Sequence, residues 1–221
     1  MQRIQDTFIN VLDKFVPLAD RVVLEIGCGT GYYSEQIAHR CRRLIGIDPD
    51  SQKLEIANCL VLPNAQFLPR SIQSTDFADG RFDAAIFTLS LHHVPVADMR
   101  RALDEAMRVT TPGGRIVVLE PTTKGSFFDA ELQFGACDGD ERPAKAAAQK
   151  ALEDHPKLQE LVGLRGETVF KLDNLEDFMS SMAPRDPGRR FKNIDLIPAF
   201  LRTHKYKLRA TRSVTIYKIR A

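Results

Sequence analysis

The sequence predicts an α/β fold built around a mostly parallel sheet. Residues 22–26, VVLEI, have the length and β-branched content of a buried parallel strand, and a glycine-rich turn and a helix-like segment follow them. Further apolar runs alternate with helix-like segments as far as residue 120. Strands that alternate with helices in this way form parallel sheets with right-handed crossovers.

Three glycines, Gly27, Gly29 and Gly31, form the turn after this first strand. A tight reversal needs residues at positive φ, which glycine adopts easily, and glycine has no Cβ to keep a ligand away from the backbone. The second strand, residues 43–47, ends at Asp48, about 20 residues after the turn, where folds of this kind bind ribose hydroxyls. The spacing therefore predicts a nucleotide-like ligand at the turn.

The remaining elements up to residue 120 follow from periodicity and capping. Apolar residues at helical spacing predict amphipathic helices at 2–16 and 98–109. A helix at 51–60 has Asp50 or Ser51 as its expected N-cap. The other expected strands are 65–68, 84–88 and 115–120, the last after a turn at 110–114.

The glycine turn is compatible with two kinds of ligand. A dinucleotide-binding turn has the pattern G-x-G-x-x-G/A. If the pattern starts at Gly27, its last position is Tyr32, which is a mismatch. If it starts at Gly29, the last position is Ser34, which is a small substitute. Glu25 stands two residues before the turn, where a carboxylate suits a ligand with an ammonium and a sulfonium and repels a pyrophosphate. An NAD-dependent oxidoreductase and a glycine turn of another α/β protein stay open as alternatives.

Motifs over residues 21–121 carry a resemblance to a known family. VLEIGCGTG at 23–31 resembles motif I of class I S-adenosylmethionine (SAM) dependent methyltransferases. FADGRFD at 77–83, SLHHV at 90–94 and TPGGR at 111–115 also resemble this family, and most of all its small-molecule branch related to ubiquinone/menaquinone-type methyltransferases. The resemblance implies an enzyme with a Rossmann-like seven-stranded sheet, helices on both faces and an antiparallel last strand. SAM would be its cofactor and S-adenosylhomocysteine its product.

The resemblance also implies a role for each residue of the cofactor site. The three glycines would line the methionine part of SAM, and Glu25 would reach its ammonium. Asp48 would accept hydrogen bonds from both ribose hydroxyls. The acid that often follows the third strand in this family, where it accepts from the adenine amino group, is replaced by Ser71. The residues expected to contact the cofactor are Glu25, Gly27, Cys28, Gly29, Gly31, Asp48, Pro49, Ser71, Ile72 and Leu89.

Two residues at the ends of strands are candidates for catalysis. Methyl transfer from a sulfonium mainly requires alignment of the reacting atoms, and a base helps only where the acceptor must lose a proton. His92 follows the fourth strand, and histidine, with an ordinary pKa of about 6.5, suits this task. Glu120, at the end of the fifth strand, is the second candidate. A structural role for His92, packed against the cofactor, is the alternative.

The chain leaves the family pattern from residue 125 on. We interpret about 122–184 as a helical lid inserted in a single domain of residues 1–221, where such enzymes keep their substrate selectivity; extra helices that only thicken the fold are the alternative. The expected helices are 126–136, 141–153, 158–164, 174–182 and 197–204, and the expected final strands are 206–212 and 214–220.

Composition limits the remaining possibilities. The formal net charge of +2 is too small to imply nucleic acid, and no apolar run approaches the ~20 residues of a membrane span. The four cysteines form no C-x-x-C pair and no cluster with zinc spacing. We therefore expect a cytoplasmic monomer or homodimer without a metal, a membrane partner or a nucleic-acid partner.

The acceptor is expected to be a small molecule methylated on oxygen, nitrogen or carbon. Nucleic-acid amino-methyltransferases usually carry N/D-P-P-Y/F after the fourth strand, whereas this chain has TLSL at 88–91. That difference disfavours an RNA methyltransferase. A SAM-binding regulatory or partner protein without methyl transfer is the alternative function.

Overall fold

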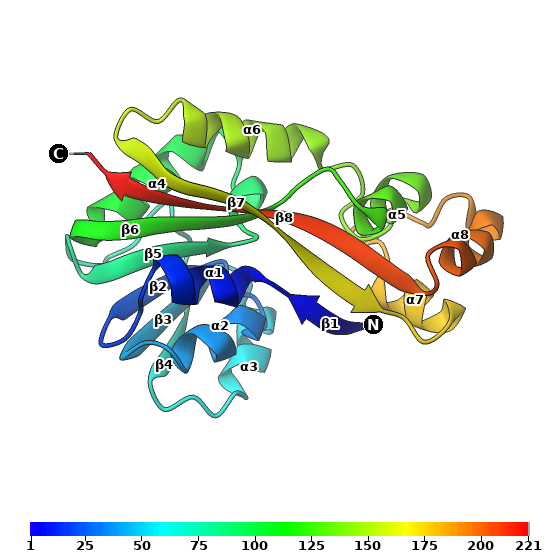
Figure 1. The fold of residues 1–221 in the computed structure, drawn as a ribbon, viewed down its shortest axis with the longest axis horizontal. Coiled ribbons are helices and arrows are strands. Elements are labelled where there is room, and N and C mark those ends of the chain that lie inside the picture. The colour runs from blue at the N-terminus through cyan, green and yellow to red at the C-terminus, as the bar shows by residue number, and fades with distance from the viewer. Residues whose placement is uncertain (221) are drawn as a thin grey trace. The chain divides into compact units, whose positions relative to one another are not determined.

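The computed structural model describes residues 1–220, which form two compact units (Figure 1). The first unit comprises residues 1–7, 121–145 and 165–212, and the second comprises 8–120, 146–164 and the chain from 213 on. Each unit has buried apolar clusters of its own. We describe the second unit first, because it contains the glycine turn.

Counted over the described residues, the sheet has eight strands in the order β4-β3-β2-β5-β6-β8-β7-β1, one more than the expected seven, and all but β1 (Gln2–Asp6) lie wholly or partly in the second unit. Its neighbours from β4 to β6 are parallel. The N–H of Arg220 donates to the carbonyl of Lys157, so β7 runs antiparallel to β8. The predicted mostly parallel sheet with an antiparallel end is thus confirmed. The strands are β2 (Val22–Ile26), β3 (Arg43–Asp48), β4 (Ala65–Pro69), β5 (Phe82–Thr88), β6 (Thr110–Pro121), β7 (Leu158–Lys171) and β8 (Lys207–Ile219).

Helices pack on both faces of this sheet (Figure 1), because successive strand residues point to opposite sides. Val23 packs in a cluster with residues of α1 and α2, whereas Leu24 packs in the opposite cluster with residues of α4 and α6. Across residues 1–220, no helix has the length and apolar character that a membrane span needs. The helices are α1 (Phe8–Phe15), α2 (Tyr32–Ala38), α3 (Ser51–Asn58), α4 (Met99–Arg108) and α6 (Arg142–Glu153).

The parallel strands end level with one another. Ile26 of β2 pairs with Ile47 of β3 and with Phe87 of β5. Asp48 pairs with Pro69, the last residue of β4, and β5 is paired with β6 up to its own last residue. This register brings the carboxyl ends of five strands to one edge, which is where open α/β sheets bind ligands.

The first unit has a separate apolar core. β1 (Gln2–Asp6) pairs antiparallel with the second half of β7, so that Gln2 faces Lys171 and Asp6 faces Thr168. The core contains Phe134, whose ring centroid lies 6.0 Å from that of Phe178. The helices of this unit are α5 (Ser126–Phe134), α7 (Leu175–Ser181) and α8 (Ile197–Thr203), with the 3₁₀ turn η3 (Ile194–Leu196) before α8.

The prediction of one helix over residues 2–16 is wrong. Residues 2–6 form β1, and the helix begins only at Phe8. The side chain of Ile4 is 45% exposed and does not extend an apolar helix face. The hydroxyl of Thr7 accepts from the N–H of Glu167, which helps hold this segment against β7. Pairing with a strand more than 150 residues away overrides the local helical periodicity.

Two further predictions near the C-terminus are wrong. Residues 158–164 begin the strand β7, where a short helix was expected, and the expected strands 206–212 and 214–220 are the single strand β8. Ser213 continues β8, whose antiparallel partner is β7. The inserted region is therefore not wholly helical.

The turn expected at 110–114 lies within β6, where the register shifts from Phe82–Thr110 to Ala84–Arg115.

Two alanine substitutions test whether residues 2–16 form a strand and a helix or one continuous helix. Leu12→Ala, at a side chain with no exposed surface on α1, should lower the free energy of unfolding by about 2–5 kcal/mol. Ile4→Ala should change it by less than about 0.5 kcal/mol. Urea denaturation measures both, and equal losses would support the single amphipathic helix instead.

Candidate functional site

The glycine turn after β2 is tied to the end of β3. The N–H groups of Gly27 and Cys28 both donate to the carbonyl of Ile47, at 2.8 and 3.1 Å. Gly27 and Gly31 have φ of +74° and +87°, in the left-handed region that favours glycine. A Cβ on Gly27 would lie 2.2 Å from the Cβ of Ser90. Both the backbone and the packing therefore require glycine at this position.

Gly29 differs from the other two glycines in its surroundings. Its φ is +54°, and a Cβ placed on it would have only the Cδ of Lys53, 4.0 Å away, as a neighbour. The backbone at Gly29 thus faces open space, and a ligand can approach it closely.

Asp48 connects the turn to the next helix. Its Oδ2 accepts from the N–H of Gly29 and its Oδ1 from the N–H of Asp50, both at 2.9 Å. Asp50 in turn caps α3 by accepting from the N–H groups of Gln52 and Lys53, which confirms it as the N-cap. Each carboxylate oxygen of Asp48 can accept a further hydrogen bond. Asp48 therefore holds the turn and still has acceptors for two hydroxyl groups.

Glu25 is buried beneath the turn. It has no exposed surface, and it accepts from the hydroxyl groups of Ser34 on α2, at 2.5 Å, and Thr88 on β5, at 3.0 Å. Burial raises the pKa of Glu25 to about 7, against the opposing effect of these hydrogen bonds. A negative charge at this point is costly until a positive charge comes near. The contact of Glu25 with an ammonium group stays a prediction.

The chain turns sharply after β5. Leu89 has φ +57°, which is uncommon for a residue with a branched side chain, and its N–H donates to the carbonyl of Leu119 at 2.8 Å. The hydroxyl of Ser90 donates to the carbonyl of Ile26 at 2.6 Å. These bonds hold the segment after β5 against the glycine turn. Backbone strain of this kind clusters at functional sites.

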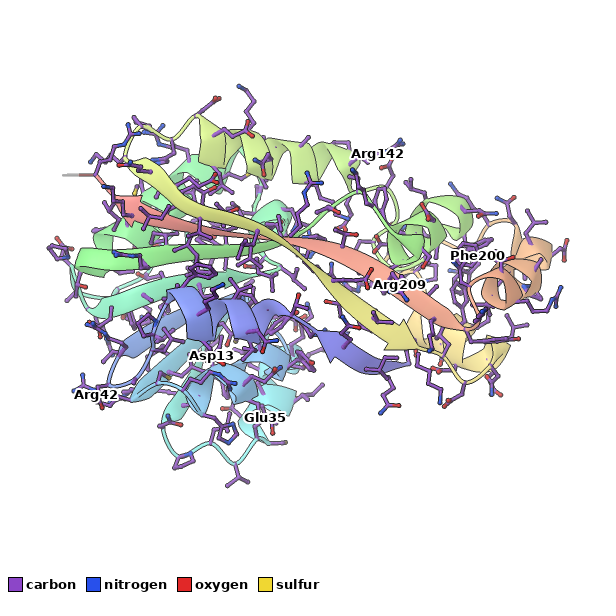
Figure 2. All side chains as sticks on the ribbon, viewed as in Figure 1. Asp13, Glu35, Arg42, Arg142, Phe200 and Arg209 are labelled. Atoms are coloured by element: carbon purple, nitrogen blue, oxygen red, sulfur yellow. The ribbon has the colours of Figure 1, made fainter. Side chains whose placement is uncertain are left out.

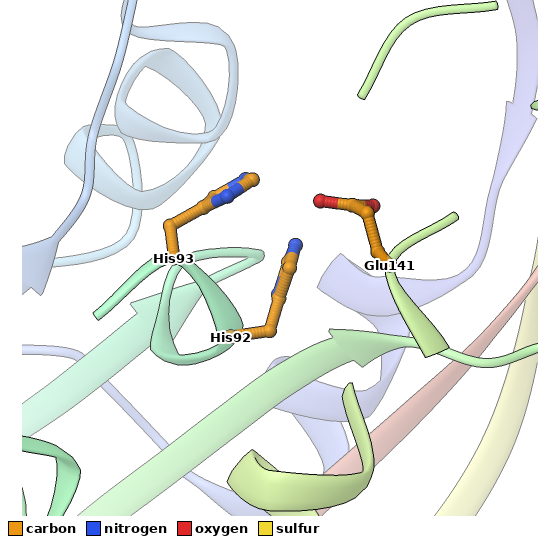
Figure 3. A group of neighbouring side chains, drawn as sticks. All are labelled: His92, His93 and Glu141. Atoms are coloured by element: carbon orange, nitrogen blue, oxygen red, sulfur yellow. The ribbon is translucent and has the colours of Figure 1, made fainter. Parts of the chain in front are cut away.

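His92 and Glu120 form a buried pair at the same edge. His92 lies in the 3₁₀ turn η1 (Leu91–His93), and its Nδ1 is 2.5 Å from Oε2 of Glu120. Oε1 of Glu120 accepts from the N–H of Leu91 at 2.9 Å. His92 and Glu120 are 5% and 8% exposed. Figure 3 shows the imidazole of His92 beside that of His93, with ring centroids 4.0 Å apart. Glu120 thus orients the His92 ring through Nδ1.

The other predicted cofactor residues have more ordinary surroundings. Pro49 is exposed after β3, and Ser71 is half-buried with its hydroxyl bonded to the side-chain oxygen of Gln73. Ile72 is 4% exposed and packs into the apolar core, so only its backbone remains for an adenine ring. Cys28 is buried, and this burial raises the pKa of its thiol well above the usual range. Cys28 therefore packs as a small apolar residue.

Sequence reasoning missed three parts of this arrangement. It did not anticipate the bond between Asp48 and Gly29, the pairing of His92 with Glu120, or the contact of Ser90 with the glycine turn. The level ends of parallel strands could have predicted the pairing of His92 with Glu120. A separate cleft at the amino ends of the strands contains none of the predicted residues. The glycines, Asp48 and the His92–Glu120 pair gather at the carboxyl edge, where open α/β sheets bind ligands.

Comparisons with known proteins give a family for part of the chain. Residues 23–114 match the family described as a methyltransferase domain. An uncharacterized methyltransferase of Mycobacterium leprae is 30% identical over 135 residues, which are 61% of this chain and 49% of the relative. The chain thus spans about half the length of the curated relatives it matches.

Solved structures share the fold. A candidate methyltransferase of Bacillus halodurans superposes with a TM-score of 0.68 at 14% identity, over 98% of this chain and all of the other. The [4+2]-cyclase SpnF superposes with a TM-score of 0.58 at 20% identity, over 93% of this chain and 78% of the other. At these identities the likeness shows the fold alone.

The buried Glu25 makes stability depend on pH. Its folded-state pKa is raised, so the native state is favoured while Glu25 is protonated, and this contribution is lost as pH rises from about 4.5 through about 7. Between about pH 5 and pH 8, the wild type should lose roughly 2–3 kcal/mol of unfolding free energy relative to Glu25→Gln, which cannot ionise. Denaturation of both proteins at the two pH values measures this, and parallel pH profiles would contradict it.

Proposed function

We propose that this chain, whose residues 23–114 match the methyltransferase-domain family, transfers a methyl group from SAM to a small-molecule acceptor. The observation that supports this most is the hydrogen bond from the N–H of Gly29 to Asp48. It joins the open glycine backbone and a carboxylate with free acceptor capacity into one cradle, which suits a ligand with an amino-acid part and a ribose.

The residues present fit SAM in charge and in space. Gly29 leaves room for the methionine part, and Asp48 supplies acceptors for the ribose hydroxyls. A cationic ligand above the turn would stabilise the ionised form of the buried Glu25, whereas a pyrophosphate would be repelled by that form. Pro49, Ser71, the backbone of Ile72 and the strained Leu89 would line the adenine side and the reacting side of the same edge.

SAM supplies an activated methyl group when it is bound. The chain's part is to align the acceptor atom with the methyl carbon and the sulfur, and to accept a proton where the acceptor must lose one. We assign the proton to Nε2 of His92. Glu120 would stabilise the resulting imidazolium through Nδ1, in the way that a carboxylate supports histidine in other enzymes.

A small-molecule acceptor, methylated on oxygen, nitrogen or carbon, is supported by the sequence. The net charge is only +2, and the segments SLHHV and TPGGR resemble the small-molecule branch of the family. We further propose that residues of the 122–184 region select the acceptor. The fold does not specify a reaction, since the cyclase named above shares it. SAM binding without methyl transfer is therefore the second candidate function.

The turnover experiment separates these functions. Purified protein is incubated with SAM and fractions of a small-molecule extract, and mass spectrometry follows S-adenosylhomocysteine and methylated products. We expect one fraction to yield both. Binding of SAM without product from any fraction would favour a regulatory or partner protein. Failure of both SAM and S-adenosylhomocysteine to bind would overturn the proposal.

Asp48→Ala should weaken binding of S-adenosylhomocysteine by about 10-fold or more, equivalent to ~1.4 kcal/mol, because the ribose loses its acceptor and the turn loses its tether. Isothermal calorimetry measures the affinity. Asp83→Ala is the matched control, since Asp83 accepts from the N–H of Val22 at the amino end of β2. Unchanged affinity in Asp48→Ala would contradict the ribose role.

The His92–Glu120 pair predicts a distinct kinetic pattern once an acceptor is known. His92→Ala should lower kcat by about 10²–10⁴-fold and leave the affinity for S-adenosylhomocysteine nearly unchanged. Glu120→Gln should lower kcat less, because an amide still orients the imidazole but stabilises the imidazolium less than a carboxylate. Full turnover by a folded His92→Ala protein would assign His92 a structural role.

A further inference from the structure

A cleft of about 720 Å³ lies at the amino ends of β2, β3 and β4, away from the glycine turn. Val22 begins β2 and Gly27 follows its end, so the two ends of this strand are separated by roughly 17 Å at ~3.3 Å per residue. The volume falls within the ~300–1,000 Å³ of typical small-molecule sites. All residues lining the cleft belong to the second unit.

The cleft lies beside an unusual connection in the sheet. Parallel strands are usually joined by a crossover helix, but residues 70–81, between β4 and β5, contain none. Phe77 of this connection packs on Phe82, with ring centroids 5.1 Å apart. Val22 and Ile45 line the cleft from the sheet, on the face to which the connection contributes Phe77. The cleft therefore has an apolar floor.

Three arginines surround this floor. Arg42 and Arg43 stand at the start of β3, and Arg81 precedes β5. All three are exposed, and Figure 2 shows Arg42 projecting outward from its strand end. The guanidinium of Arg81 lies over the ring of Phe77, 4.8 Å from its centroid.

No acidic residue of the described chain balances these charges at the cleft. Neither aspartate nor glutamate lines it, and within residues 1–220 none of the three arginines forms a salt bridge. The guanidinium of Arg43 donates to the side-chain oxygen of Gln66, at a long 3.4 Å. By contrast, Arg21, at the same end of the sheet, pairs with Asp83. The cleft is thus a local concentration of positive charge next to apolar surface.

We propose that this cleft binds a small organic anion that carries a phosphate or carboxylate group on an aromatic body. Guanidinium groups bind such oxyanions through two parallel hydrogen bonds, and the consecutive Arg42 and Arg43 line the cleft together with Arg81. Ile45 has no exposed surface, so the half-buried Val22 supplies the apolar surface for the aromatic part. This proposal does not depend on the proposed methyl transfer, because the two sites lie at opposite ends of the strands.

Phenyl phosphate tests the proposal, with phenol and inorganic phosphate as its two halves and benzoate as the carboxylate probe. Titrations followed by calorimetry use the full chain in the presence of excess S-adenosylhomocysteine, so that the probe does not occupy the cofactor site. We expect phenyl phosphate or benzoate to bind at least about 10-fold more tightly than phenol or phosphate, since each half makes only part of the contacts. Equal affinities for the whole probe and a half would overturn the proposal.

Arg43→Gln and Arg81→Gln should each weaken probe binding by about 10-fold or more. These side chains are exposed, so the variants should unfold at the same urea concentration as the wild type. Arg202→Gln, which removes one exposed charge from α8 in the other unit, is the matched control and should bind normally. An equal loss in Arg202→Gln would show attraction by net charge alone and overturn the assigned site.

Discussion

The candidate site depends on the hydrogen bonds that tie the glycine turn to the end of β3. The carbonyl of Ile47 accepts from Gly27 and Cys28, and Asp48 accepts from Gly29. These bonds require neighbouring parallel strands that end level with each other, and they require glycines whose φ is positive. The same carboxylate then reaches α3 through Asp50. The turn, the strand and the helix therefore form one preorganised unit, and a ligand need not order them.

Buried polar groups are concentrated at this edge of the sheet. Glu25 has two hydroxyl partners, and His92 is held by a carboxylate that also accepts from a backbone N–H. Burial of such groups costs free energy, and an apolar core would be stable without that cost. Their position beside a strained Leu89 is what a functional edge predicts. The amino ends of the same strands have a different character, because three exposed arginines without a salt bridge among residues 1–220 lie there beside apolar residues. The carboxyl ends and the amino ends of these strands thus present two chemically distinct surfaces.

Predictions from the sequence succeeded where local signals and sheet geometry agreed. The bounds of β2 were predicted to the residue, and the helices after the glycine turn and after Asp50 were placed correctly. They failed where a distant partner decided the structure. Residues 2–6 and 158–164 have helical periodicity, yet both form strands because β1 pairs with β7 and β7 with β8. Backbone hydrogen bonds to a distant strand outweigh propensity differences of a few tenths of a kcal/mol per residue.

The sequence by itself determined the glycine turn, the acid at the end of the second parallel strand, and the order in which strands and helices alternate, because each of these rests on backbone conformations that nearby residues enforce. Only the tertiary structure decided which side chains meet. Glu120 lies 28 positions from His92 and Thr88 lies 63 from Glu25, and their contacts exist because the level ends of neighbouring strands bring them together. Side-chain pairing across a sheet depends on strand order and register, which no local pattern encodes.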